Sequence, residues 1–154
     1  MDAAKGWLEL GDHIHANEDL EKITAKLRAH PDVLKVRWRV YAQAKKWNVC
    51  LLIAQTVTEL EPEKPGGWID YAQSLHRLNR TQAAYDLLLS VADRFPEHST
   101  VFYHLAVYGC RLHKVREAWA WLERTFEIGD ADQIKLKALD DSDLEPLWAE
   151  ISEV

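Results

Sequence analysis

Apolar residues recur at helical spacing along most of the chain, and they do so in pairs of short segments. Between residues 65 and 96, the first segment places Trp68, Tyr71 and Leu75 at intervals of three and four residues. Such intervals bring side chains to one face of an α-helix. A polar break at Asn79 precedes a second segment with the same spacing. The stretch is therefore predicted to be two helices joined by a tight turn.

The same arrangement is predicted on both sides of this pair. Residues 31–62 give one helix pair and residues 99–130 give another. Pro31 suits the first turn of a helix, where its missing N–H is not needed. Ser99 is predicted to cap the last pair, and Gly129 is predicted to end it in a left-handed conformation.

The pairs repeat with a period of 34 residues. Pro62 and Pro96 are separated by this interval, and Asp130 follows Pro96 after the same interval. The second helices then align without gaps, and small residues share one position in them. These residues are Cys50, Ala84 and Ala118. Small residues at one repeated position favour a close approach of two helices at that point.

This pattern resembles the tetratricopeptide repeat (TPR) family, whose helix pairs have this length and carry Trp-x2-Leu-Gly-x2-Tyr, Ala-x3-Phe and a final Pro. The middle pair matches it with Trp68, Ala84, Leu88 and Pro96. The resemblance implies an all-α fold in which about three helix pairs stack as a right-handed superhelix. The repeats are assigned to residues 31–62, 65–96 and 99–130, within a single domain of residues 1–154.

The segments that flank the repeats are interpreted as incomplete or capping elements. Asn17 can cap a helix with one apolar face, so residues 16–30 are interpreted as an N-terminal half-repeat. Residues 131–154 are predicted to form two short helices, the second capped by Asp143 or Ser142. A solenoid leaves the face of its last repeat open, so we expect this tail to act as a C-terminal cap.

In the TPR family, the first helix of each pair lines a concave groove, and the register defines which residues would lie there. These residues are Lys35, Arg39, Asp70, Gln73, Arg77, Tyr103, His104 and Arg111. Arginine presents a planar fork that suits carboxylates, so the expected ligand is an acidic or C-terminal peptide segment of another protein. The Lys/Asn/Arg clamp of chaperone-binding members is not matched, because Gln73 and Val107 occupy its asparagine positions.

Composition narrows the classes of partner and compartment. The formal net charge of −6 provides no general attraction to nucleic acid. No run of 18 apolar residues is present, so no membrane span is predicted. The first residues lack a basic start and an apolar stretch, and Cys50 and Cys110 have no paired spacing. We therefore expect free thiols and a cytoplasmic location.

Candidate chemistry is sparse. His13 with His15, or Cys110 with His113, could contribute to a metal site, but zinc normally requires four such ligands. The acidic run 140–143 lacks the glycine and distal glutamate of a calcium-binding loop, so a capping turn is the preferred interpretation. No phosphate-binding or nucleophile motif occurs. The sequence thus predicts no enzyme activity, no cofactor and no metal.

Seven tryptophans must find packing partners. Trp38, Trp47 and Trp68 stand at repeat positions and are predicted to be core residues. Trp119 and Trp121 are two residues apart, about 200° around a helix, so only one of them is expected in the core. The other is expected to lie between repeats or under the tail, and the alternative for it is ligand stacking.

The predicted function is that of a non-enzymatic scaffold that binds a peptide or helix of a partner. The alternative is a structural protein whose exposed apolar ends drive self-association into a homo-oligomer.

Overall fold

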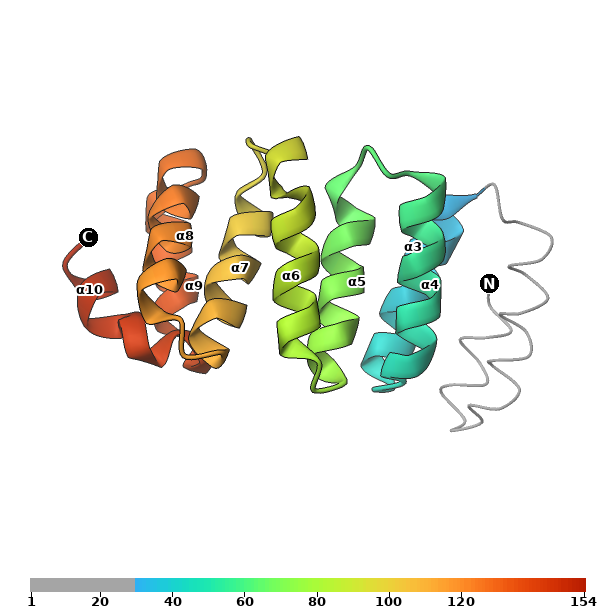
Figure 1. Ribbon diagram of the computed structural model, residues 1–154, viewed down its shortest axis with the longest axis horizontal. Coiled ribbons are helices and arrows are strands. Elements are labelled where there is room, and N and C mark those ends of the chain that lie inside the picture. Colours follow the sequence, from blue (N-terminus) through green and yellow to red (C-terminus); the bar gives the residue numbers. More distant parts are fainter. Residues whose placement is uncertain (1–29) are drawn as a thin grey trace. The chain divides into compact units, whose positions relative to one another are not determined.

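The computed structural model describes residues 30–154, and in that range the chain forms helices and turns without a strand (Figure 1). The chain divides into two compact units, Met1–Leu78 and Asn79–Val154, and each is considered by itself. The helix predicted after Asn17, and with it the half-repeat assigned to residues 16–30 except its last residue, lies outside the described residues.

Unit 1 is described from residue 30 onward and contains three helices. They are α3 (Pro31–Gln43), α4 (Trp47–Leu60) and α5 (Pro65–Arg77).

Unit 2 begins with a helix and a short 3-10 turn, continues with a helix pair and ends in the tail. The elements before the tail are α6 (Thr81–Val91), η1 (Ala92–Arg94), α7 (Ser99–Arg111) and α8 (Val115–Ile128). The tail consists of α9 (Ala131–Leu139), the 3-10 helix η2 (Ser142–Leu147) and α10 (Trp148–Ser152).

The 34-residue period predicted from the sequence is present in the backbone itself. Helices α3, α5 and α7 begin 34 residues apart, and so do α4, α6 and α8. The turns also repeat, because Lys45, Asn79 and His113 all have positive φ, at 57°, 62° and 62°. Most residues other than glycine and asparagine are strained when their backbone adopts this left-handed conformation. The same turn therefore recurs even where the residue type does not favour it.

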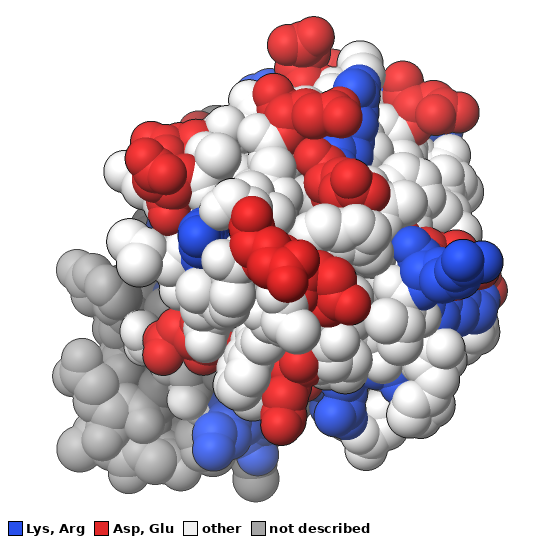
Figure 2. All heavy atoms as spheres, turned by 90° about the vertical axis from the view of Figure 1, so that its left-hand side faces the viewer, with Lys and Arg blue, Asp and Glu red and all other residues white. Residues whose placement is uncertain are grey.

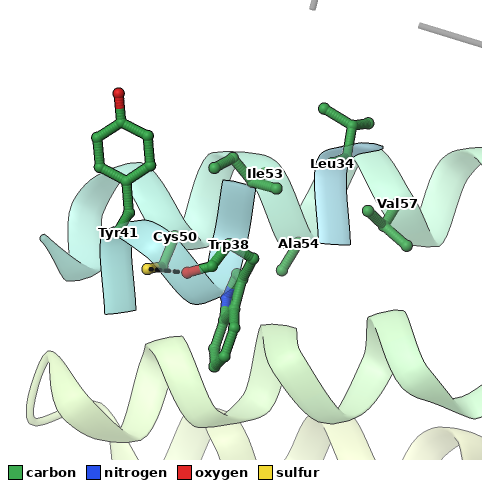
Figure 3. Close-up of a cluster of buried hydrophobic side chains, with 7 residues drawn as sticks. All are labelled: Leu34, Trp38, Tyr41, Cys50, Ile53, Ala54 and Val57. Carbon is green, nitrogen blue, oxygen red and sulfur yellow. Dashed lines mark hydrogen bonds between the residues drawn. The ribbon is translucent and has the colours of Figure 1, made fainter. Parts of the chain in front are cut away.

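Unit 1 is held by an apolar cluster on α3 and α4 (Figure 3). The Trp38 indole points toward α5, where its Nε1 donates a hydrogen bond of 3.0 Å to Ser74 Oγ. The thiol of Cys50 donates to the Trp38 carbonyl oxygen over 3.6 Å. Trp38 is buried, which confirms its prediction as a core residue.

Trp47 is half-buried and packs against the core cluster, so its core prediction holds only in part. The core prediction for Trp68 is wrong, since its side chain is half-buried and lies outside that cluster. The indole of Trp68 donates to the Pro62 carbonyl oxygen (3.0 Å) near the surface, and its neighbour Gly67 is buried instead. A Cβ atom on Gly67 would lie 2.8 Å from Val57 Cγ1, so α5 approaches α4 through this glycine.

In unit 2, α7 is the most deeply buried helix among the described elements, with nine consecutive or near-consecutive residues in the core. It packs mainly on α8 and also on α6. Trp119 and Trp121 are both half-buried, so the expectation that one of them lies in the core is wrong. Ala118 and Leu122 fill the inner face of α8 instead.

The tail packs against the last helix pair. η2 contacts α7, and α9 contacts α8. Leu144, Leu147 and Ile151 are fully buried. The tail has three short elements rather than two, and the capping residue is Asp141, whose carboxylate accepts from Asp143 N at 3.1 Å. Neither Asp143 nor Ser142 caps the second helix.

The predictions for the two ends of the last helix pair are also wrong. His98 precedes α7 and makes no side-chain cap, while Ser99 is already the first helical residue. Gly129 is extended, with φ −100° and ψ −171°, rather than left-handed. A Cβ at this position would lie 2.6 Å from Ile134 Cδ1 and 3.1 Å from Ser99 Oγ, so a larger residue would require these side chains to shift.

The close approach of α5 to α4 makes a testable prediction about two adjacent glycines. Gly67→Ala should lower the free energy of unfolding by about 1–3 kcal/mol, because the new methyl group meets Val57 and Thr58. Gly66→Ala meets nothing within 4 Å and should raise it by about 0.5–1 kcal/mol. Urea unfolding of the two variants measures both values. Equal stabilities would show that Gly67 is not a contact point.

The capping role expected of the tail makes a second prediction. Leu144→Ala should destabilise the protein by about 2–5 kcal/mol, because Leu144 is 0% exposed against the last helix pair. The control is Leu136→Ala in the same tail, since Leu136 is 72% exposed and its loss should change stability by no more than about 0.5 kcal/mol. Thermal melts that give both variants the same midpoint would contradict the cap.

Candidate functional site

The candidate groove residues of unit 1 begin with Lys35 on α3. Its Nζ atom lies 3.2 Å from Oε1 of Glu61, the residue that follows α4. Glu61 also pairs with Lys64, and the hydrogen bond from Lys64, more than that from Lys35, lowers the pKa of the Glu61 carboxyl. The charge of Lys35 is therefore already matched within unit 1.

Asp70 on α5 lies in the field of two cations on α3. Burial raises the pKa of the Asp70 carboxyl to about 6, while the charges of Lys35 and Arg39 act in the opposite direction. Arg39 is exposed. The charges of Lys35 and Arg39 on α3 thus act on the Asp70 carboxyl on α5, and the assignment of these three residues to a binding groove stays a prediction.

Gln73 and Arg77 continue along α5. The Arg77 guanidinium lies over the Trp47 ring, with Cζ 5.5 Å from the ring centroid. Trp47 in turn contacts Trp38, at 6.2 Å between ring centroids. Among the described residues, no side-chain hydrogen bond or salt bridge joins Arg39, Gln73 or Arg77 to another residue. Arg39 and Arg77 are exposed, and Gln73 is half-buried.

The candidate groove residues of unit 2 lie on α7, and the tail contacts two of them. The Tyr103 hydroxyl donates a 2.9 Å hydrogen bond to Asp141 Oδ2, and Lys137 Nζ lies 4.4 Å from the Tyr103 ring centroid. Burial, followed by the hydrogen bond to Asp141, raises the pKa of Tyr103. The ring of His104 lies edge-on to Tyr103, with centroids 6.2 Å apart.

Arg111 also faces the tail. Its Nη1 atom lies 3.8 Å from Asp143 Oδ1. The acidic turn before and within η2 therefore places two carboxylates against α7, one on Tyr103 and one on Arg111. Figure 2 shows that acidic side chains outnumber basic ones on the end of the molecule that the tail forms.

These contacts of the acidic run 140–143 with α7 were not predicted from the sequence. The run was interpreted as a capping turn, and Asp141 does cap η2. The same carboxylate accepts from Tyr103 on α7, however, and only the tertiary structure brings these two residues together. The excess of acidic side chains beside an apolar stripe was the one available signal.

The eight candidate residues thus fall into two sets, five in unit 1 and three in unit 2. That all eight line one continuous groove stays a prediction.

A second feature of unit 2 is a hollow of about 470 Å³ between α6, α7 and α8. Aromatic and charged side chains dominate its lining. They are Tyr85, Asp93, Phe102, Glu117, Trp121 and Arg124. Trp121 stacks on Phe102 with centroids 5.7 Å apart and an interplanar angle of 19°, and its Nε1 donates to the Tyr85 hydroxyl at 3.0 Å. The sequence analysis raised ligand stacking for this pair of tryptophans only as an alternative.

Other chemistry finds little support in residues 30–154. No three His, Cys, Asp or Glu side chains of this range are placed to hold a metal ion. Burial raises the pKa of Cys50 to about 12 and that of Cys110 to about 11, so neither thiol is activated as a nucleophile. His13 and His15 lie outside the described residues. None of the helices in the described part is both long and apolar enough to cross a bilayer.

Solved structures with the same arrangement of helices identify the fold. The chain is similar to a thermophilic TPR protein of Thermus thermophilus, with a TM-score of 0.69 and 16% identity over 96% of this chain and 79% of that one. It is also similar to MamA, with a TM-score of 0.68 and 16% identity over 98% and 91% of the two chains. A second MamA structure, MamA MSR-1, gives 0.62 and 19% over 81% and 72%.

The chain has a TPR-like all-α solenoid fold. The fold class predicted from the sequence is therefore confirmed. No protein-family model and no curated protein matches the sequence. At these identities the likeness concerns the fold alone, and the function has to be argued from the TPR-like surfaces themselves.

The position of Asp70 makes a testable prediction about pH. A carboxyl NMR titration should give Asp70 a pKa near 6, against an ordinary value of 3.8. Arg39→Gln removes a cation that favours the ionised form, so it should raise this pKa further. Lys45→Gln removes a cation that does not act on Asp70 and should leave it unchanged. A pKa of Asp70 near 4 in the unmodified protein would contradict the burial of its carboxyl.

The raised pKa of Asp70 makes the free energy of unfolding depend on pH. The pKa of Asp70 is higher in the folded than in the unfolded protein, so the folded state binds more protons between about pH 4 and 6. The contribution of Asp70 to stability is therefore greatest below pH 4 and falls as the pH rises through this window. Asp70→Asn should remove that part of the pH dependence in urea unfolding curves.

Proposed function

We propose that this protein is a non-enzymatic interaction scaffold that binds an acidic segment of a partner protein on the first helices of its repeats. The fold supports the general class, because TPR-like solenoids present extended surfaces rather than a closed catalytic pocket. In unit 1 the binding residues are Arg39, Gln73 and Arg77, with Lys35 and Asp70 beside them. In unit 2 the candidate residues are Arg111, Tyr103 and His104, but the tail already engages Arg111 and Tyr103, so the proposed site rests on unit 1.

The observation that supports an acidic ligand is the contact between Arg111 and the tail. Arg77 and Arg111 occupy the same repeat position, 34 residues apart. Arg111 already faces the carboxylate of Asp143, while the guanidinium of Arg77 makes no salt bridge with a described residue. The tail thus illustrates within one chain how a first helix of this protein accepts an acidic turn. The guanidinium of Arg77 could bind an acidic segment of a partner protein in the same way.

The strength of such binding can be bounded. An exposed contact between arginine and a carboxylate contributes about 0.2–1 kcal/mol, more where it is bidentate. Two or three such contacts, together with packing on the Trp47 ring, correspond by themselves to affinities in about the millimolar range or weaker. Because exposed charges are screened over about 8 Å at physiological ionic strength, salt should weaken the complex.

Self-association is the second candidate function, favoured by two exposed leucines. Leu52 on α4 is 64% exposed and Leu136 on α9 is 72% exposed. Light scattering after size exclusion separates the two functions, because a scaffold can remain monomeric. A concentration-dependent increase in mass that Leu52→Ser abolishes would favour the oligomer.

The test of the scaffold uses two matched double variants. Arg39→Glu with Arg77→Glu reverses the exposed charges of the proposed site, whereas Lys45→Glu with Lys46→Glu makes the same change of net charge in the turn before α4. Each protein serves as bait in native cell extract, and captured proteins are identified by mass spectrometry. The first variant should lose the partners that the unmodified protein captures, by about tenfold or more, and the second should retain them.

Circular dichroism must show the same helical content for both variants. If the arginine reversal destabilises α3 through the nearby Asp70, the neutral pair Arg39→Gln with Arg77→Gln serves instead. Retention of the same partners by a folded arginine variant would contradict the proposed site.

A further inference from the structure

We infer that the hollow between α6, α7 and α8 is a second interaction site, which receives an arginine side chain from a partner polypeptide. This site lies within unit 2, and it has the opposite charge preference from the site proposed on the first helices. It does not depend on that proposal, and either can fail without the other.

The wall of the hollow is aromatic and already fixed in place. Trp121 is held on one side by stacking on Phe102 and at its edge by the hydrogen bond from Nε1 to the Tyr85 hydroxyl. The indole N–H is therefore satisfied within unit 2. What Trp121 still offers to a ligand is its π-surface, and the indole ring is the aromatic group that attracts cations most strongly.

The unmatched polar groups of the hollow are acceptors. Asp93 and Glu117 both line it and are exposed, and neither forms a salt bridge or side-chain hydrogen bond with a described residue. A ligand that fills the hollow must therefore bring N–H donors and positive charge to these carboxylates.

The basic side chains near the hollow are already engaged. Arg124 lies over the Phe102 ring, with Cζ 5.8 Å from the centroid, and its Nη1 is 3.4 Å from Glu127 Oε2. Lys114 lies over the Tyr85 ring, at 4.9 Å from Nζ to the centroid, and forms no salt bridge with Glu117. Two of the three aromatic rings thus carry a cation from the chain itself, while no described cation lies over Trp121.

Among cationic groups, guanidinium fits this set of partners best. Its flat face can stack on the indole while its edge donates several hydrogen bonds to carboxylates. The ammonium of lysine is more strongly hydrated and lacks the planar face. A hollow of about 470 Å³ has room for the whole side chain and part of its backbone. We therefore assign the site to arginine in a peptide segment.

The probe is the peptide acetyl-Gly-Gly-Arg-Gly-Gly-amide, added to the ¹⁵N-labelled full-length chain. The Trp121 indole N–H signal in the ¹H–¹⁵N spectrum, assigned by its loss in Trp121→Phe, should shift and saturate in the millimolar range. The lysine peptide should bind several-fold more weakly. A peptide with citrulline in place of arginine keeps the shape without the charge and should leave the signal unmoved.

Two neutral variants test the acceptors against a matched control. Asp93→Asn and Glu117→Gln should each weaken the arginine peptide by about threefold or more, and together by about tenfold. Glu123→Gln removes an exposed carboxylate from the same helix, α8, outside the hollow, and should change the affinity by less than twofold. All these side chains are exposed, so the variants should keep the fold.

Three results would overturn the inference. The citrulline peptide could shift Trp121 as strongly as the arginine peptide, which would assign recognition to shape alone. The affinity could be unchanged in the Asp93 and Glu117 double variant, which would remove the carboxylates from the site. The arginine peptide could also leave the Trp121 signal in place at ten millimolar, which would show that the hollow is closed to this ligand or filled by another part of the chain.

Discussion

The close approach of paired helices at small residues is the constraint on which the rest of this structure depends. Cys50, Ala84 and Ala118 are completely buried at one position of the repeat. Opposite Ala118, a Cβ on Gly109 would lie only 3.0 Å from the alanine methyl group. Because there is no room for larger side chains at this crossing, these small residues set the distance between α7 and α8. The larger residues a turn away, such as Leu122, can then interlock.

This packing explains why the polar faces of the helices are available for binding. The inner faces of α4 and α8 are occupied by apolar side chains, and Arg39, Arg77 and Arg111 on the first helices are exposed, whereas Arg37 on α3 is buried. In unit 1, Lys35 pairs with Glu61, which follows α4, and Arg77 lies on the Trp47 ring. The exposure of the three arginines is a consequence of the repeat.

The tail shows how one segment can serve both the core and the surface. Its apolar residues, among them Leu144 and Ile151, fill the open side of the last helix pair. Its acidic residues lie at the margin of the same contact, where Asp141 accepts from Tyr103 and Asp143 faces Arg111. The tail therefore combines buried leucines with carboxylates that contact Arg111 and Tyr103 on α7. Burial of apolar side chains contributes most of the stability of this contact, and the charged contacts help to fix the orientation of the tail on α7.

The sequence by itself determined the helices, their period and the fold class, because these depend on local spacing and on small residues that recur every 34 positions. It could not determine which aromatic side chains are buried. Both Trp38 and Trp68 were predicted to be buried from their positions in the repeats. Trp68 is only half-buried, however, and its neighbour Gly67 makes the close contact with α4. The positioning of Asp141 against Tyr103, 38 residues away, and the stacking of Trp121 on Phe102 were decided only by the tertiary structure. Contacts between residues far apart in the sequence depend on how the helices pack against one another. The spacing of residues within one helix does not determine this packing.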